Sequence, residues 1–379
     1  MAYLDYKVAQ VPTGWRKVFH ISWPLVVLIT AVCCIGFLML YSVAGGRIEV
    51  WAEPQMYRFA VGMALMLALA FVPMWFWRGI SVAAYVVCFL MLVAVDLFGV
   101  IGMGAQRWID LGPIRIQPSE LMKISLVLLL AAYYDWLDIR RVSRPLWVVI
   151  PVLLILAPTA LVLIQPDLGT SIMLVAGGGI VMFAAGVSLW YFVVVLGGGV
   201  GLVMAVLNSR GTDWQLLKDY QYRRIDTFLD PAADPLGAGY NVIQSQIALG
   251  SGGWAGRGFM QGTQSRLNFL PEKHTDFIFT VLAEEFGFVG AISLLTLYML
   301  ILGFCLYSAL SNRDRFASLI TIGISGTFFL YFAINMATVM GMLPAKGSPL
   351  PLVSYGGTSL MILMLGFGLV QSAHVHRPR

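Results

Sequence analysis

Six ionisable side chains fall within long apolar runs or at their ends, where an ionised group is costly unless it has a partner or a function. They are Asp96, Glu120, Lys123, Asp276, Glu284 and Glu285. Asp276 is distinctive because it follows a polar, proline-containing stretch and precedes a long apolar run in "FLPEKHTDFIFTVLAEEFG". A carboxylate at such a place can act as a general base, hold a metal ion, or cap the following helix.

Glu120 and Lys123 form a second candidate pair in "QPSELMKIS". Their spacing places both side chains on one face of a helix that begins near Pro118, so they can form an ion pair. A lysine near a helix N-terminus opposes the helix dipole and, near lipid, costs a few kcal/mol unless it is paired or hydrated. The pattern is compatible with a structural ion pair. It is also compatible with a cation that lines an outward-facing cavity, with Glu120 holding it in place.

Two further polar residues lie beside apolar runs. Asp167 precedes one in "QPDLGTS" and can cap that helix or face a substrate. His274, two residues before Asp276, can orient that carboxylate or tune its pKa. The sequence contains no metal-binding motif and no phosphate-binding loop typical of nucleotide enzymes, so nucleotide binding is not predicted.

The elements that must position these residues are transmembrane helices. Of the 379 residues, 59% are hydrophobic and 11% are charged, and the mean hydropathy is +0.83. The apolar runs are each near the roughly 20 residues that a spanning helix needs. We predict an all-α, polytopic membrane protein with about ten transmembrane helices in a single domain over residues 1–379. The predicted spans are 21–44, 56–76, 80–100, 118–136, 147–165, 169–186, 188–207, 276–310, 315–340 and 352–372.

The run 276–310 is too long for a simple crossing. At about 1.5 Å per residue it would extend about 52 Å, well beyond the roughly 30 Å of the hydrocarbon core. We therefore expect part of it to protrude, with a bend at Gly287 or Gly290.

The distribution of Lys and Arg between the short loops predicts the orientation, since basic residues favour the cytoplasmic side. The loops on the side of the N-terminus carry the larger share, which places both termini in the cytoplasm. The long segment 208–275, between the seventh and eighth predicted helices, then lies outside. The net charge of +5 mostly reflects this topology and does not indicate nucleic-acid binding.

Several motifs occur together in the order that is typical of one known family. They are "GAQRWIDLG", "IQPSELMKI", "QPDLGTS", "LDPAADPLGAGYNVIQSQIALGSGGWAGRG", "GTQSRLNFLPEKHTDFIFTVLAEE" and "LPLVSYGGTSLM". On these runs, from the first predicted helix to the last, the chain resembles the SEDS family of bacterial cell-shape, division and sporulation proteins. Within that family, "DPLGAGYNVIQSQ" and "GTQS" are most similar to the elongation members, whereas Lys346 is more typical of the division members.

The resemblance implies a peptidoglycan polymerase that joins lipid II units to a growing glycan strand at the outer face of the bacterial cytoplasmic membrane. The aspartate of the "HTDFIF" motif, here Asp276, is regarded as essential in the family, and Trp108, Glu120 and Lys123 match other functional positions. The implied partners are a class B penicillin-binding transpeptidase, other elongation-complex membrane proteins and membrane lipids. A divalent cation is implied to support activity.

The residues also suit the chemistry of such a transfer. A sugar on a polyprenyl diphosphate can be displaced in one inverting step, with one carboxylate accepting the proton of the attacking hydroxyl. We assign Asp276 as that base, although it could instead hold a metal ion that carries the leaving diphosphate. Trp108 is a candidate for stacking on a sugar. Candidates for stabilising the departing anion are Lys123, Arg107, Arg223 and Arg224. The competing hypotheses are a lipid II flippase and a non-catalytic scaffold for a transpeptidase.

Overall fold

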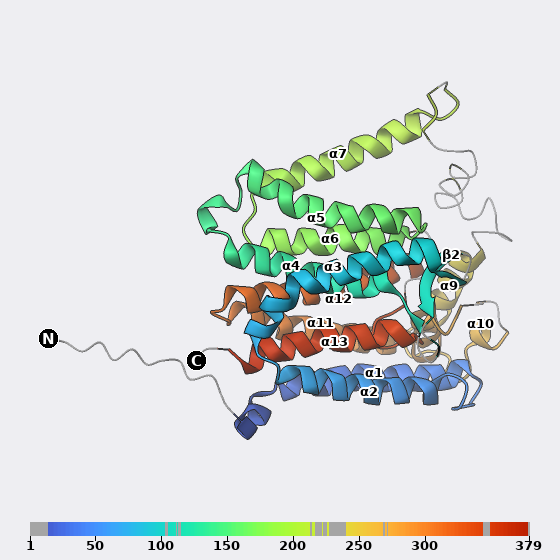
Figure 1. The fold of residues 1–379 in the computed structure, drawn as a ribbon. Coiled ribbons are helices and arrows are strands. Elements are labelled where there is room, and N and C mark those ends of the chain that lie inside the picture. The colour runs from blue at the N-terminus through green and yellow to red at the C-terminus, as the bar shows by residue number, and fades with distance from the viewer. Residues whose placement is uncertain are drawn as a thin grey trace.

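The computed structural model describes residues 14–102, 105–110, 112, 115–212, 214–216, 222, 226, 240–267, 270, 272–343 and 349–377. Long helices that run side by side make up most of it (Figure 1), and each predicted span overlaps one of them. These helices are α1 (Trp23–Val43), α2 (Ala52–Ala70), α3 (Met74–Phe98), α4 (Pro118–Trp136), α5 (Pro145–Ile164), α6 (Leu168–Ala184), α7 (Leu189–Asn208), α11 (Ile278–Leu310), α12 (Arg315–Val339) and α13 (Gly357–Val375).

Seven of the described helices are long and apolar enough to cross a membrane, namely α1, α3, α5, α7, α11, α12 and α13. Of the others, α6 is apolar but has only 17 residues. α4 carries Glu120, Lys123 and Asp135, which lower its hydropathy. The number and length of the apolar helices make the chain a multi-pass membrane protein, as predicted.

A small antiparallel sheet follows α3. It consists of β1 (Val100–Gly102), β2 (Ala105–Asp110) and β3 (Arg115–Ile116) in that order, with Ile109 of β2 opposite Ile116. The prediction of an all-α fold is therefore wrong for this segment. A connection between helices must satisfy its own backbone groups, and antiparallel pairing does so within a few residues. The described residues of the range 208–275 include the short helices α9 (Tyr240–Ser251) and α10 (Thr263–Arg266).

α11 bends at Gly287, which confirms one of the two predicted positions. This residue has φ 65° and ψ −158°, a conformation that favours glycine. A Cβ here would also lie 2.3 Å from the backbone nitrogen of Gly256. The neighbouring loop supplies hydrogen bonds where the helix is interrupted: Arg257 N donates to Glu284 O (3.0 Å), and Phe288 N donates to Gly253 O (2.8 Å). The loop therefore stabilises the bend.

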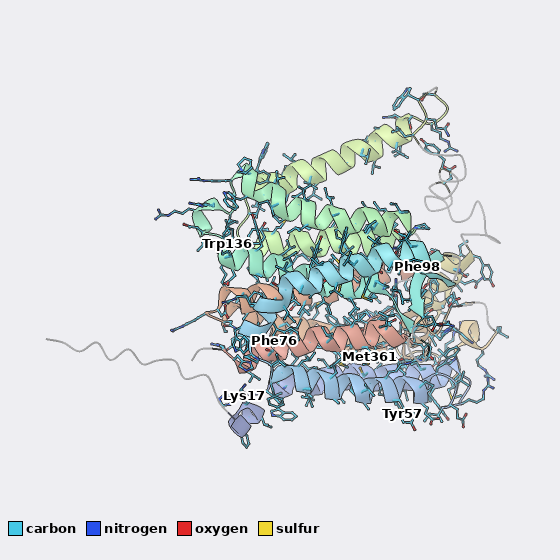
Figure 2. All side chains as sticks on the ribbon, in the orientation of Figure 1. Lys17, Tyr57, Phe76, Phe98, Trp136 and Met361 are labelled. Atoms are coloured by element: carbon cyan, nitrogen blue, oxygen red, sulfur yellow. The ribbon has the colours of Figure 1, made fainter. Side chains whose placement is uncertain are left out.

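The two ends of the bundle differ. Lys17 Nζ lies 2.9 Å from His376 Nε2, so the start of the described chain meets the end of α13 at one end, which we call the termini end. The sheet, α9 and α10 lie at the opposite end, which we call the loop end (Figure 1). Figure 2 shows Lys17 and Trp136 toward the termini end and Phe98 toward the loop end.

The helices are unequally packed. Tyr298, Phe328 and Phe367, from α11, α12 and α13, are almost fully buried, with the ring of Phe328 5.5 Å from Tyr298 and 5.3 Å from Phe367. α7 has no buried residues and diverges from α5 and α6 toward the loop end (Figure 1). The core therefore lies around α12, which contacts α4, α6, α11 and α13.

Candidate active site

Asp276 lies in a turn just before α11, at the loop end of the bundle. The backbone nitrogens of Asp276 and Phe277 donate to Glu272 O at 3.2 and 3.3 Å, which closes the turn. The residue before the helix is Phe277, and the first turn of α11 contains no acidic residue. Asp276 is thus neither the helix cap nor a first-turn acid, which overturns that alternative and leaves its carboxylate for other chemistry.

Three donors from two other parts of the chain fix the backbone of this turn. Three successive carbonyl groups each accept one hydrogen bond, and such a set leaves the turn little freedom. Tyr355 N donates to His274 O (3.0 Å), the Ser354 hydroxyl donates to Thr275 O, and Asn335 Nδ2 donates to Asp276 O (2.9 Å). The turn is therefore held by α12 and by the segment before α13, two regions distant in sequence.

The electrostatic surroundings of Asp276 favour proton uptake near neutral pH. Burial of the carboxylate, with a smaller contribution from the negative charge of Glu272, raises the pKa of Asp276 from 3.8 to about 7. Burial lowers the pKa of His274. The His274 ring stacks on Trp51, with centroids 4.2 Å apart and an interplanar angle of 18°. His274 thus anchors the turn to the start of α2.

Glu120 and Lys123 form the ion pair that their spacing predicted. Lys123 Nζ donates to Glu120 Oε1 at 2.6 Å, and the two residues are only 4% and 7% exposed. The hydroxyl of Tyr331 accepts from Lys123 and donates to Glu120 Oε2. Sequence reasoning missed Tyr331, because nothing in the α12 sequence indicates which of its residues faces α4. The three side chains form a closed polar cluster inside the bundle.

This polar cluster borders a small cavity between α4, α12 and α13. The cavity is otherwise mostly apolar, with Ile124, Val127, Ile324, Ile362 and Leu363 among its lining residues. A second small cavity shares Tyr331 and also contacts Ser354, which holds the Asp276 turn. Asp276 itself lines neither cavity. α12 links the two regions, since Tyr331 and Asn335 lie one helical turn apart.

Arg107 and Asp167 lie together at the start of α6. Arg107 donates from Nε to Gln165 O (3.0 Å) and from Nη2 to Pro166 O (2.7 Å). Its Nη1 lies 3.8 Å from Asp167 Oδ2. Asp167 also accepts from Thr170 N at 3.1 Å, which confirms it as the cap of α6. Both side chains are therefore engaged within the protein.

Trp108 lies in β2 opposite Val100 of β1 and is partly buried. The structure does not bring it into contact with Asp276 through any described interaction. Arg223 and Arg224 lie outside the described residues. Among the described residues, no three His, Cys, Asp or Glu side chains are grouped so that they could hold a metal ion.

The FtsW/RodA/SpoVE family, described as "Cell cycle protein", matches residues 22–379. The chain belongs to this family, the SEDS proteins. Two similar relatives of this SEDS chain span nearly its whole length. "Peptidoglycan glycosyltransferase MrdB" of Escherichia coli is 43% identical over 367 residues, covering 96% of this chain and 96% of the relative. "Stage V sporulation protein E" of Bacillus subtilis is 33% identical over 367 residues, covering 91% and 94%.

Solved structures agree with this placement. One, reported as "Structural coordination of polymerization and crosslinking by a peptidoglycan synthase complex", has a TM-score of 0.78 at 33% identity and covers 94% of this SEDS chain and 98% of that chain. The rod shape determining protein RodA of Thermus thermophilus has a TM-score of 0.71 at 29% identity, covering 95% and 98%. The predicted resemblance to the SEDS family and its elongation members is confirmed.

Proposed function

We propose that this SEDS protein is a peptidoglycan glycosyltransferase that polymerises lipid II into glycan strands during cell elongation. The observation that carries the proposal is Asp276, whose pKa is raised to about 7 in a turn fixed by three hydrogen bonds. A general base works best when its pKa is near the working pH. The activity named for the relative MrdB supports the same reading.

The reaction proceeds by inversion at the anomeric carbon. Asp276 accepts the proton of the acceptor sugar hydroxyl as the oxygen of that hydroxyl forms a bond to the anomeric carbon of the donor. The bond from that carbon to the diphosphate oxygen breaks on the opposite face, and the polyprenyl diphosphate leaves with the electron pair. One carboxylate is sufficient, and no covalent sugar intermediate is needed.

The other predicted residues surround this step in supporting roles. We propose that Lys123, positioned by Glu120 and Tyr331, supplies positive potential from inside the bundle. Trp108 stacks on a sugar. Arg107 and Asp167 hold the start of α6 beside the sheet that carries Trp108. Arg223 and Arg224 are further candidates for contacts with the diphosphate.

A divalent cation fits this site only if the protein and the substrate bind it together. Mg²⁺ is usually bound by one or two carboxylates together with substrate phosphates. Asp276 and Glu272 are the carboxylates that would hold it, because the charge of Glu272 already acts on Asp276. A bound cation would partly neutralise the diphosphate and lower the pKa of Asp276.

The proposal includes the topology that the basic residues predict. The protein forms a single domain in the bacterial inner membrane with about ten crossings and both termini in the cytoplasm. The loop end, with segment 208–275, then faces outward, where lipid II and the glycan strand meet. A class B penicillin-binding transpeptidase is the proposed partner, in line with the synthase complex to which this fold is similar.

One assay separates the enzyme from its alternatives. Purified protein, with its transpeptidase partner inactivated, receives labelled lipid II and a divalent cation, and glycan chains are resolved on a gel. We expect chains from the wild type and none from Asp276→Asn with unchanged folding. Movement of lipid II across vesicles without chain formation would favour a flippase. Equal polymer in strains carrying wild type and Asp276→Asn would favour a scaffold.

A further inference from the structure

The departing diphosphate requires a cation that is not already neutralised within the protein. Lys123 is paired with Glu120 and Tyr331, and Arg107 is engaged with two carbonyl groups and Asp167. Neither is free to bind a diphosphate without losing these contacts. Arg58 on α2 differs in this respect, and it contacts Tyr355, whose backbone holds the Asp276 turn.

The guanidinium of Arg58 is held in place but not neutralised. Among the residues that the structure describes, its buried Nη1 has no hydrogen-bond acceptor, and no carboxylate forms an ion pair with it. The Cζ atom lies 4.7 Å from the centroid of the Tyr355 ring. A cation stacked on an aromatic ring retains its hydrogen-bond donors, because the ring contacts only the face of the group.

Arg58 also lies against the N-terminus of α13. A Cβ built on Gly357, the first residue of that helix, would lie 3.4 Å from Arg58 Nε. No side chain caps α13, so its first amides are donors without intrahelical partners. Two positive groups, the guanidinium and the helix end, therefore lie close together. Such an arrangement is unfavourable until an anion joins them.

Tyr355 connects Arg58 and the start of α13 to the proposed base. Its backbone nitrogen donates to His274 O at 3.0 Å, and its ring packs on Trp51, which stacks on His274. Gln55, one turn before Arg58 on α2, donates to Ser354 O (3.1 Å). The same residues that fix the Asp276 turn thus fix Arg58 and the start of α13.

We propose that Arg58, Tyr355 and the first amides of α13 form the binding site for the diphosphate of a polyprenyl diphosphate. Arg58 provides a planar fork that matches two phosphate oxygens, and the helix amides contact the other side of the group. Binding of the diphosphate does not depend on catalysis. Its role as the leaving group rests on the proposed function.

The test measures binding of undecaprenyl diphosphate to the full chain in phosphatidylcholine nanodiscs, without lipid II. We expect Arg58→Gln to weaken binding by about tenfold or more, since charge-assisted bidentate contacts are strong. The matched control is Arg47→Gln, because Arg47 is exposed in the loop that precedes α2 and donates only to Ala44 O in a described hydrogen bond. We expect this control to bind like the wild type. Wild-type affinity in folded Arg58→Gln would overturn the proposal.

Competition distinguishes the sources of a phosphate group. We expect undecaprenyl monophosphate to compete more weakly than undecaprenyl diphosphate, and phosphatidylglycerol to compete least. Equal competition by phosphatidylglycerol would show a general lipid-headgroup site and overturn the assignment. Failure of glycan synthesis with normal diphosphate binding would contradict the proposed function but not this site.

A second measurement needs no substitution at Arg58. Phenylglyoxal modifies arginine side chains, and peptide mass spectrometry can follow Arg58 and Arg47 in the same wild-type sample. We expect saturating undecaprenyl diphosphate to protect Arg58 at least fivefold and to leave Arg47 unchanged. Equal modification of Arg58 with and without the ligand would contradict the site.

Discussion

The two charged regions of this protein satisfy their polar groups in different ways. Inside the bundle, Glu120, Lys123 and Tyr331 satisfy one another, and all three are buried. At the loop end, the hydrogen bonds to the Asp276 turn bind its carbonyl groups, while burial and Glu272 raise the pKa of the carboxylate. A charge whose partners lie within the protein therefore supports structure, whereas a perturbed side chain on a fixed backbone supports chemistry.

The largest expected effect is the loss of polymerisation in Asp276→Asn. Removal of a general base should lower the rate by about 10²- to 10⁴-fold, because the amide cannot accept the proton. The thermal unfolding midpoint should stay at or above that of the wild type, since the substitution removes repulsion from Glu272. Rates from lipid II and unfolding curves from the same preparations check both parts. A large loss of stability would mean that Asp276, like the members of the buried polar cluster, mainly stabilises the fold.

The main effect of Lys123→Met should instead be a loss of stability. It leaves Glu120 buried without its cation, which typically costs about 3–5 kcal/mol. The double substitution Glu120→Gln, Lys123→Met should recover part of this loss, because no buried charge remains. Thermal unfolding of the two single variants and the double variant measures the coupling. Additive losses would show that the ion pair is unimportant in the membrane.

Tyr331→Phe tests whether the third member of the buried polar cluster matters. Loss of the hydroxyl removes a donor to Glu120 and an acceptor for Lys123, at a cost of about 1–3 kcal/mol. Tyr85→Phe is a matched control, since Tyr85 donates to Leu154 O on α5, away from this cluster. We expect polymerisation to fall more in Tyr331→Phe than in the control. Equal polymerisation by the two variants would show that the Tyr331 hydroxyl does not contribute to activity.

Asn335→Ala should lower the free energy of unfolding only modestly, by about 1 kcal/mol for one hydrogen bond. Its effect on the rate should be larger than this loss suggests, about tenfold, because a displaced base loses its alignment. The kinetic measurement should show a lower kcat with a nearly unchanged KM. A change in KM alone would indicate a binding role for Asn335.

Local features could be predicted from the sequence because they depend on neighbours along one helix. The apolar runs predicted the helix positions, the i, i+3 spacing predicted the Glu120–Lys123 pair, and the excess length predicted the bend at Gly287. Asp167 as a cap follows from its place before α6.

Contacts between distant segments could not be predicted in the same way. Tyr331 and Arg58 each meet residues more than two hundred positions away, and no periodicity of α12 or α2 indicates these partners. The sheet after α3 was missed because its strands are too short to give a clear alternation. Asp276 could be recognised from the sequence as a charge beside a long apolar run. The residues that donate hydrogen bonds to its turn could not be recognised in this way, and they are Asn335, Ser354 and Tyr355.

The dependence of the polymerisation rate on pH provides the sharpest test of Asp276 as the general base. The folded protein holds the pKa of Asp276 at about 7, above its ordinary value of 3.8, so the base is ionised above this pH and protonated below it. We predict that kcat/KM for lipid II falls about tenfold for each pH unit below about 7 and is level above it. Glu272→Gln should move this midpoint to lower pH. A rate that stays constant between about pH 5 and pH 8, in protein that remains folded, would contradict Asp276 as the base.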